Sequence, residues 1–169
     1  MQDKDNTINL FAEGLPASIL EAISDGISIQ DINFKVLYQN KIHKNSIGDR
    51  AGEFCYRAYE GRDAVCEGCP LVLVFKDGGT HTAERSTLLG GKLFHVEIKA
   101  SPLKNSKGKI IAGVEVVSDI TERKLAEEQI KESENRFRGA FENVAFGASI
   151  IDIKGKFIKV NQSLCRMLG

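Results

Sequence analysis

Thirty residues of this chain occur twice in related form. Residues 19–48 align with residues 140–169 without a gap, at an offset of 121 positions, and nine aligned pairs are identical. The identical pairs are Glu21/Glu142, Gly26/Gly147, Ser28/Ser149, Ile29/Ile150, Asp31/Asp152, Ile32/Ile153, Lys35/Lys156, Asn40/Asn161 and Gly48/Gly169. Such a repeat is typical of a tandem array of one structural module. The second copy stops where the first has run through about a third of its length.

The repeat predicts the domain organisation. Residues 1–15 form an N-terminal leader, and residues 16–121 form one complete domain with its own core. Residues 119–138 form a charged connector helix, and residues 139–169 are the opening of a truncated second domain. A chain of 169 residues has room for one complete domain of ordinary size.

The charge balance argues against some classes of partner. The chain has 23 Lys and Arg against 23 Asp and Glu, so it offers no electrostatic reason to bind nucleic acid or an anionic membrane. Residues 1–17 lack the apolar stretch of a secretory signal. The longest compact apolar run, Leu71–Phe75, is too short to span a bilayer. We therefore expect a cytoplasmic protein without membrane insertion.

Alternating apolar residues predict five strands. The first two form a hairpin that turns at residues 31–33, with Ile27, Ile29, Val36 and Tyr38 at alternating positions. Three longer strands are predicted at residues 80–88, 92–103 and 109–117, joined by glycine-containing turns. Residues 40–77 between these groups are irregular, with short helical pieces. Five antiparallel strands with helices gathered on one face make an α+β fold.

The connector has the composition of an exposed helix. Ten of its eighteen residues from Asp119 to Arg136 are charged. Asp119 is placed to cap the helix, with Glu122 as its reciprocal partner. Residues 126, 130, 133, 137, 140 and 144 form a weak heptad seam, because Ala and Ser occupy half of it. Two interpretations remain open: a solvated single helix, or a parallel coiled coil that makes the protein a homodimer.

The order of these elements resembles the PAS (sensory box) family. The sequence Ser118-Asp119-Ile120-Thr121-Glu122-Arg123-Lys124 is similar to the exit of PAS domains from the fifth strand into a signalling helix. Residues 136–169 resemble the opening of another PAS domain, and Asn40 and Asn161 stand where such domains leave the second strand. The resemblance covers residues 16–169.

The resemblance implies a sensory module rather than an enzyme. PAS domains bind a small ligand between sheet and helices, or only dimerise, and relay a conformational change to an output domain. The implied output is a histidine kinase or a diguanylate cyclase in the parent array, and this chain has no catalytic motif of either. Asp119, Thr121 and Glu122 are the residues expected to transmit the signal from the last strand to the helix.

Departures from the family patterns disfavour two cofactors. The Asn-Cys-Arg-Phe motif of flavin photoreceptors is missing, and so is the Trp on which flavin redox sensors stack their cofactor. Haem-binding members have a His on the helix before the third strand, and residues 70–76 contain none. The cofactor of this chain, if it has one, stays unknown on this evidence.

Three cysteines lie within fifteen residues, as Cys55, Cys66 and Cys69. Their Cys-x10-Cys-x2-Cys-Pro spacing resembles that of a subset of PAS domains. Cys66-x-x-Cys69 allows two thiolates to reach one metal, and Cys55 is a candidate third ligand. Pro70 suits a first helical position, so Cys69 should be the N-cap, where the helix dipole should lower its pKa. An iron–sulfur cluster, zinc, a disulfide switch and simple packing cysteines all remain open. A fourth ligand could come from His43, His81, a carboxylate, a small molecule or a residue of a second subunit.

Other functions compete with ligand sensing. A PAS domain with an empty pocket would serve only for dimerisation. A thiol oxidoreductase using Cys66 and Cys69 is disfavoured, because the thioredoxin-type βαβ pattern is missing. Residues 139–169 have two strands and no closing sheet, so we expect them to be loosely ordered or supported by a partner.

Overall fold

A computed structural model describes residues 17–89 and 91–169, so the predicted leader at residues 1–15 lies outside the described residues. The chain divides into two compact units, Met1–Thr121 and Glu122–Gly169. In the part of the chain that the structure describes, no helix is long and apolar enough to cross a membrane.

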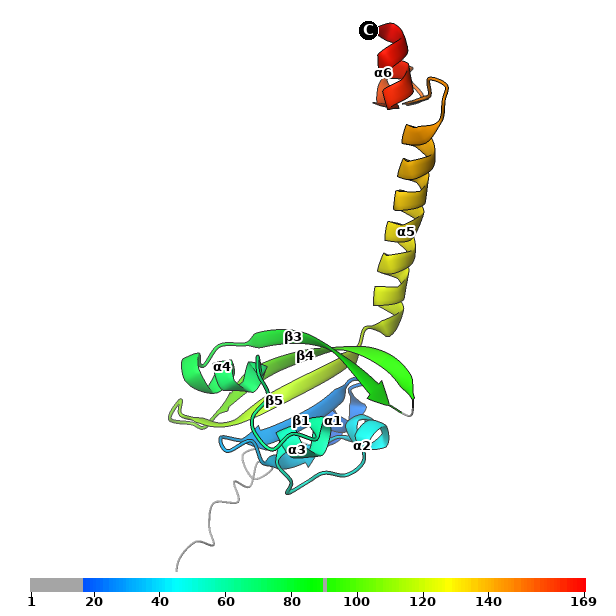
Figure 1. Cartoon of the computed structure of the whole chain (residues 1–169). Helices are drawn as coiled ribbons and strands as arrows, with labels where there is room; N and C mark the ends of the chain where they lie inside the picture. The colour runs from blue at the N-terminus through cyan, green and yellow to red at the C-terminus, as the bar shows by residue number, and fades with distance from the viewer. Residues whose placement is uncertain (1–16, 90) are drawn as a thin grey trace, which may run out of the picture. The chain divides into compact units, whose positions relative to one another are not determined.

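The first unit contains a five-stranded antiparallel sheet (Figure 1). Its strands are β1 (Gly26–Asp31), β2 (Val36–Gln39), β3 (His81–Leu89), β4 (Lys92–Lys104) and β5 (Ile110–Asp119). They lie in the order β2-β1-β5-β4-β3, so the two strands of the first hairpin join the last three through β1 and β5. The predicted α+β fold with five antiparallel strands is confirmed, and the strand ends differ from the predicted ones by one or two residues.

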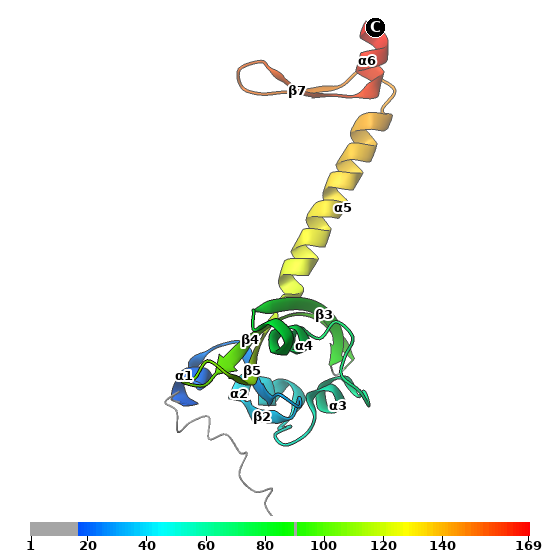
Figure 2. The same cartoon turned by 90° about the vertical axis from the view of Figure 1, so that its left-hand side faces the viewer.

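Helices α2 (Lys41–Ile47), α3 (Cys55–Glu60) and α4 (Pro70–Asp77) fill the segment between β2 and β3. Figure 2 shows α4 over the sheet, where it contacts β3, β4 and β5. The close approach needs a glycine on β5, because a Cβ at Gly113 would collide with Leu71 of α4. Leu71 and Val74 are fully buried there beside Ala100.

The short helix α1 (Ala17–Ala22) packs on the sheet through a separate apolar cluster. Leu20 contacts a core made by Ile27 and Ile29 of β1 and Ala112 of β5. Burial of these side chains supplies hydrophobic stabilisation of about 25 cal/mol for each Å² removed from water. Along β1 the apolar residues 27 and 29 alternate with the polar residues 28 and 30, so the polar ones face the opposite side of the sheet.

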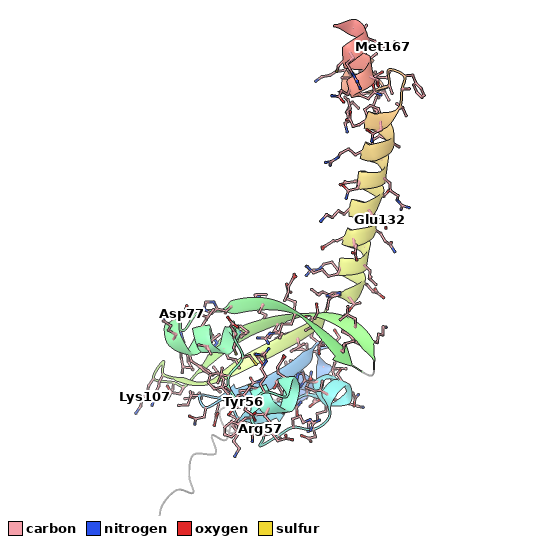
Figure 3. The ribbon with its side chains drawn as sticks, in the orientation of Figure 1. Tyr56, Arg57, Asp77, Lys107, Glu132 and Met167 are labelled. Atoms are coloured by element: carbon pink, nitrogen blue, oxygen red, sulfur yellow. The ribbon has the colours of Figure 1, made fainter. Side chains whose placement is uncertain are left out.

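Turns between the strands follow side-chain chemistry. Asp31 Oδ1 accepts hydrogen bonds from the backbone N–H groups of Asn33 and Lys35, which closes the first hairpin. Asn105 does the same for Lys107 and Lys109 in the β4–β5 turn, where Lys107 lies at the tip (Figure 3). Such Asx turns explain why these loops are short.

Phe34 adopts the left-handed backbone conformation, with φ of 67°, which is rare for a residue with a large side chain. Its ring packs against Phe75 of α4, with 5.5 Å between the ring centroids. The aligned residue of the second copy is Gly155, which also has a positive φ of 80°. The turn therefore demands this conformation, and in the first copy the aromatic contact offsets its cost of about 1 kcal/mol.

Asn40 joins three elements through its buried side-chain amide. Its Oδ1 accepts hydrogen bonds from the N–H groups of Ile27 at 2.9 Å and His43 at 3.0 Å. Its Nδ2 donates to the carbonyls of Leu20 at 3.2 Å and Asp25 at 2.9 Å. Asn40 is thus the N-cap of α2 and also fixes the chain between α1 and β1.

The second unit repeats this arrangement. It consists of β6 (Ser149–Ile151), β7 (Phe157–Val160), α6 (Gln162–Leu168) and the residues of α5 (Thr121–Asn143) from Glu122 onward. Asn161 Oδ1 accepts from Ala148 and Leu164, and its Nδ2 donates to Phe141 and Phe146. All four partners stand 121 positions after those of Asn40. The repeat seen in the sequence is therefore a repeat of structure.

Much of the apolar surface of the second unit is exposed. Its strands form a two-stranded sheet, and the exposed side chains include Ile153, Phe157 and Ile158. A lone hairpin of this kind is marginally stable in water. The expectation that residues 139–169 are loosely ordered or supported by a partner stays a prediction.

Replacement of Asn40 by Ala should lower the free energy of unfolding of the first unit by about 2–4 kcal/mol, because four hydrogen bonds are lost and buried backbone groups stay unpaired. Urea unfolding followed by far-UV circular dichroism measures this loss. Asn161→Ala is the matched control, since it removes the same bonds from the second unit alone. A loss below 1 kcal/mol for Asn40→Ala would contradict the central role of this amide.

Candidate ligand cavity and cysteine cluster

The first unit contains a cavity of about 620 Å³ between the sheet and helices α2 and α3. This volume is in the range of small-molecule sites in proteins. Its apolar wall comes from α2 and from strands β4 and β5, and consists of Ile42, Ile47, Phe94, Val96, Ile98 and Val117. Its polar groups come from four elements and include His43, Tyr59, Glu60, Arg85 and Glu115.

A buried polar network extends from the sheet to the cavity. Gln30 Nε2 on β1 donates to Glu115 Oε2 on β5 at 2.9 Å and to Ser28 Oγ at 2.8 Å. The Ser28 hydroxyl lies 2.7 Å from the hydroxyl of Tyr59 on α3. Ser28 and Glu115 are directly paired in the β1–β5 register, which places the network at the centre of the sheet.

Glu115 is the most unusual ionisable group of the network. Its side chain belongs to a residue that is only 8% exposed, and burial raises its pKa to about 7. The hydrogen bond from Gln30 and the positive charge of Arg85 act in the opposite direction. Glu115 can therefore exchange a proton near neutral pH, as functional carboxyl groups often do.

Arg85 and Glu60 belong to the polar lining of the cavity. Arg85 Nη1 on β3 lies 3.3 Å from Glu60 Oε1 at the end of α3. Glu60 is exposed and forms this ion pair from the last position of α3. The Arg85 guanidinium is also within hydrogen-bonding reach of the Cys66 side chain, so it links the cavity to the cysteines.

His43 is buried on the α2 side of the cavity. Gln39 Nε2 lies 2.7 Å from His43 Nδ1, and the ring packs edge-on against Tyr59. Burial lowers the pKa of His43 to about 4, so the imidazole is neutral at pH 7. A neutral ring bonded to Gln39 contributes hydrogen-bonding capacity but no charge to the cavity.

One end of the cavity reaches the start of α5. Asp119 lines the cavity, and its Oδ1 accepts a hydrogen bond from Thr121 N at 2.8 Å. Thr121 Oγ1 in turn accepts from His95 N on β4 at 2.9 Å. Two of the three residues predicted to transmit a signal, Asp119 and Thr121, are thus joined by a hydrogen bond. Asp119 holds the turn before α5 instead of capping it directly, since the helix begins at Thr121.

The three cysteines gather beside the network and carry free thiols. Cys55 at the start of α3 and Cys69 before α4 are buried, while Cys66 is partly exposed. Burial raises the pKa of Cys55, and the neighbouring Glu115 and the two other thiols raise it further. Among the described residues, no group of three or more His, Cys, Asp or Glu side chains is arranged to hold a metal ion. The iron–sulfur or zinc site stays a prediction.

Cys69 is the N-cap of α4, with Pro70 at the first helical position, as predicted. The predicted fall in its pKa is wrong. The N–H groups of Val72 and Leu71 do lower the pKa of the thiol, but burial raises it by more. Loss of water therefore outweighs the helix N-terminus at this position.

The other two histidines have structural partners. His81 Nε2 lies 2.9 Å from a carboxylate oxygen of Asp77, which ends α4 (Figure 3). His95 Nδ1 lies 2.9 Å from Ser86 Oγ on the neighbouring strand. His81, His43 and His95 thus each have a hydrogen-bonding partner, and none completes a metal site with the cysteines in the described residues.

Glu115, Arg85 and Tyr59 were not predicted from the sequence to be site residues. One signal pointed to the first of these: the inward-facing positions of β5 are Gly113, Glu115 and Val117, so a carboxyl group interrupts a buried face. Charged residues are almost never buried without a partner. The ion pair of Arg85 with Glu60 joins residues 25 positions apart, so no local sequence pattern indicates it.

Family models match both copies of the repeat. The model described as "PAS fold" matches residues 20–125, and the model described as "PAS domain" matches residues 135–169. The first match alone covers more than half of the chain. The proposed subset with a three-cysteine cluster is not distinguished by either match.

Solved structures share the fold at low sequence identity. An RNA-binding light-oxygen-voltage receptor aligns with a TM-score of 0.57 and 20% identity, over 79% of this chain and 40% of that chain. The Vibrio cholerae VqmA dimer aligns with a TM-score of 0.52 and 17% identity, over 63% of this chain and 51% of that chain. These likenesses support the fold alone.

A curated relative connects the sequence with a kinase. Sporulation kinase E of Bacillus subtilis (strain 168) is 40% identical over 60 residues, which is 34% of this chain and 8% of that protein. The chain therefore spans a small part of the length of this relative. Given the match over residues 20–125 and the five-stranded sheet with its helices, the chain belongs to the PAS family.

Proposed function

We propose that this chain is a non-catalytic sensory module of a signalling protein, which binds a small molecule in the cavity and relays the binding event through α5. Asp119 carries this proposal, because one side chain both lines the cavity and bonds the first residue of α5. A ligand that displaces or pairs with this carboxylate would change the geometry of the helix start. The similarity to a sporulation kinase supports a kinase as the output domain of the parent protein.

The relay would act on a helix that suits dimerisation. Ile130 and Phe137, two apolar residues of the heptad seam, are more than half exposed on α5. Exposed apolar residues at this spacing favour a parallel homodimer over a solvated single helix. A shift of register or rotation at Thr121 would then reach the output domain of both copies. Such a relay is a population shift between two packings of the connector.

The cysteine cluster supports a narrower proposal. Cys66 is partly exposed and lies near Arg85, whereas Cys55 and Cys69 are buried, so Cys66 is the thiol that an oxidant or a metal meets first. Oxidation there would alter the surroundings of Arg85 and so the polar side of the cavity. Metal or redox chemistry at this cluster would add a second input to the same sensor.

A screen of small molecules by thermal shift should find compounds that stabilise the protein, and their binding should slow or speed hydrogen exchange in the first turns of α5. Val96→Trp should abolish both effects, because the indole fills part of the cavity. Leu93→Trp is the matched control, since Leu93 is an exposed residue of the same strand outside the cavity lining.

Thr121→Val separates binding from relay. The change keeps the shape of the side chain, lies outside the cavity lining and removes the acceptor for His95 N. Binding should persist while the response of α5 disappears. Binding without any change in α5 exchange in the wild-type protein would rule out the relay.

The Glu115 carboxyl should make stability depend on pH. A raised pKa in the folded state means that folding is favoured below the unfolded pKa of about 4.3, and that this advantage is lost as pH rises to about 7. Glu115→Gln should therefore gain stability relative to wild type between pH 5 and 8, by at most about 3 kcal/mol.

Urea unfolding of the wild-type protein and of Glu115→Gln measures the difference in their stability at each pH. The contribution of His43 to the pH dependence cancels in this difference, because both proteins contain it. His43 acts in the opposite direction, because its lowered pKa makes stability rise with pH up to about 6.5. Parallel stability curves from pH 5 to 8 would mean that Glu115 is ionised throughout this range.

The cysteine proposal can be tested by absorbance, metal analysis and thiol labelling of protein purified without oxygen. An iron–sulfur cluster would give broad visible absorption with bound iron and sulfide, and zinc would appear in metal analysis alone; either should be lost in Cys66→Ser. Iodoacetamide should label Cys66 faster than Cys55 or Cys69, because burial protects the other two. Metal-free protein with equal labelling of the three thiols would refute the proposal.

A further inference from the structure

The side chains around the cavity are strongly unbalanced in charge. Four carboxyl groups line it, from Asp25, Glu60, Glu115 and Asp119, against the single guanidinium of Arg85. Glu60 already pairs with Arg85 at 3.3 Å. His43 is neutral at pH 7 because burial lowers its pKa to about 4. Lys92, whose Nζ lies 5.1 Å from the centroid of the Phe94 ring, offsets part of the charge of Asp119 at one end of the cavity. The unbalanced negative charge is therefore centred on Glu115, and the low-dielectric walls strengthen its potential.

Glu115 is the deepest of these groups and is held as a hydrogen-bond acceptor. The Gln30 amide turns its NH₂ group toward both Ser28 and Glu115. As a result, Gln30 Oε1 has no hydrogen-bond donor. Among the described residues it is the buried side-chain N or O atom that lacks a partner. This orientation presents an N–H donor to Glu115 Oε2, so the carboxyl group acts as the acceptor of this hydrogen bond. A buried carboxylate is costly unless a cation pairs with it.

Arg85 cannot fully serve as that cation. Its guanidinium already bonds Glu60 and approaches Cys66. Gln30 occupies one carboxyl oxygen of Glu115, Oε2, which leaves Oε1 for another donor. An anionic ligand would have to approach Arg85 beside two carboxyl groups, and like charges repel strongly at such short range. A positively charged ligand removes the imbalance.

The rest of the cavity defines the body of such a ligand. Tyr59 offers aromatic surface. Phe94, whose ring already has Lys92 Nζ 5.1 Å from its centroid, forms an apolar wall with Ile42, Ile47, Val96 and Val117. Aromatic faces attract cations as well as apolar groups. We propose that the cavity binds a small organic cation, an amine with an aromatic or aliphatic body, whose ammonium group pairs with Glu115. This inference deepens the proposed sensory function and rests on it.

The affinity should depend on pH through Glu115. The groups that face this carboxyl are Gln30 and Ser28 of β1, Cys55, Tyr59 and Glu60 of α3, Cys69 before α4, and Arg85 of β3. Burial raises the pKa of Tyr59 and of the two thiols, so they stay neutral near pH 7. Binding of an ammonium group should tighten from pH 6 to 8, as Glu115 releases its proton.

Two matched trios of probes test the inference by isothermal titration calorimetry. One trio is phenethylamine, phenethyl alcohol and hydrocinnamate; the other is tryptamine, tryptophol and indolepropionate. In at least one trio the amine should bind about tenfold or more tightly than its neutral and anionic analogues, which corresponds to about 1.4 kcal/mol. Glu115→Gln should remove this preference, whereas Glu67→Gln, in an exposed loop outside the cavity lining, should leave it intact.

The outcomes separate this inference from the proposed function. A preference for the anion, or equal affinity for amine and alcohol, would overturn the cation inference while the cavity still binds a ligand. Failure of all six probes, with hits from the small-molecule screen that Val96→Trp abolishes, would also overturn the inference alone. Failure of the probes and of the screen together would overturn both.

Discussion

The fold of the first unit depends on one side-chain amide. Asn40 closes four hydrogen bonds that tie the end of α1, the start of β1 and the first turn of α2 to one point. Since β1 pairs with both β2 and β5, fixing its start also fixes the register of the sheet. The β1–β5 register then places Ser28 opposite Glu115, where the polar network is formed.

The two faces of the sheet differ in chemical character. One face carries the apolar cluster of Leu20, Ile27, Ile29 and Ala112, which contributes to stability. The other face carries Ser28, Gln30 and Glu115, which weaken the core but give it specific chemistry. A buried carboxyl group and an unpaired amide oxygen are costs that a purely structural domain has no reason to keep. Their position beside the cavity is the one that the proposed binding function requires.

Local patterns in the sequence predicted most of the fold. Alternation predicted the strands, glycines and Asx residues predicted the turns, and the repeat identified Asn40 and Asn161 as equivalent. The site was harder to predict, because Tyr59, Arg85 and Glu115 come from three elements that meet only in the folded chain. The direction of the Cys69 pKa was missed for a related reason. Sequence shows the helix start at Pro70 but not how deeply the thiol is buried.

The buried pair of Gln30 and Glu115 also bears on how a tandem chain folds correctly. Two related hairpins in one chain can exchange places during folding, which is a known hazard of repeated domains. The second copy has Ile151 where the first has Gln30, and Val160 where the first has Gln39. A second-copy hairpin placed against β5 would leave the carboxyl of Glu115 without its amide donor. The hydrogen bond from Gln30 to Glu115 therefore favours β1 over the related strand β6 as the neighbour of β5.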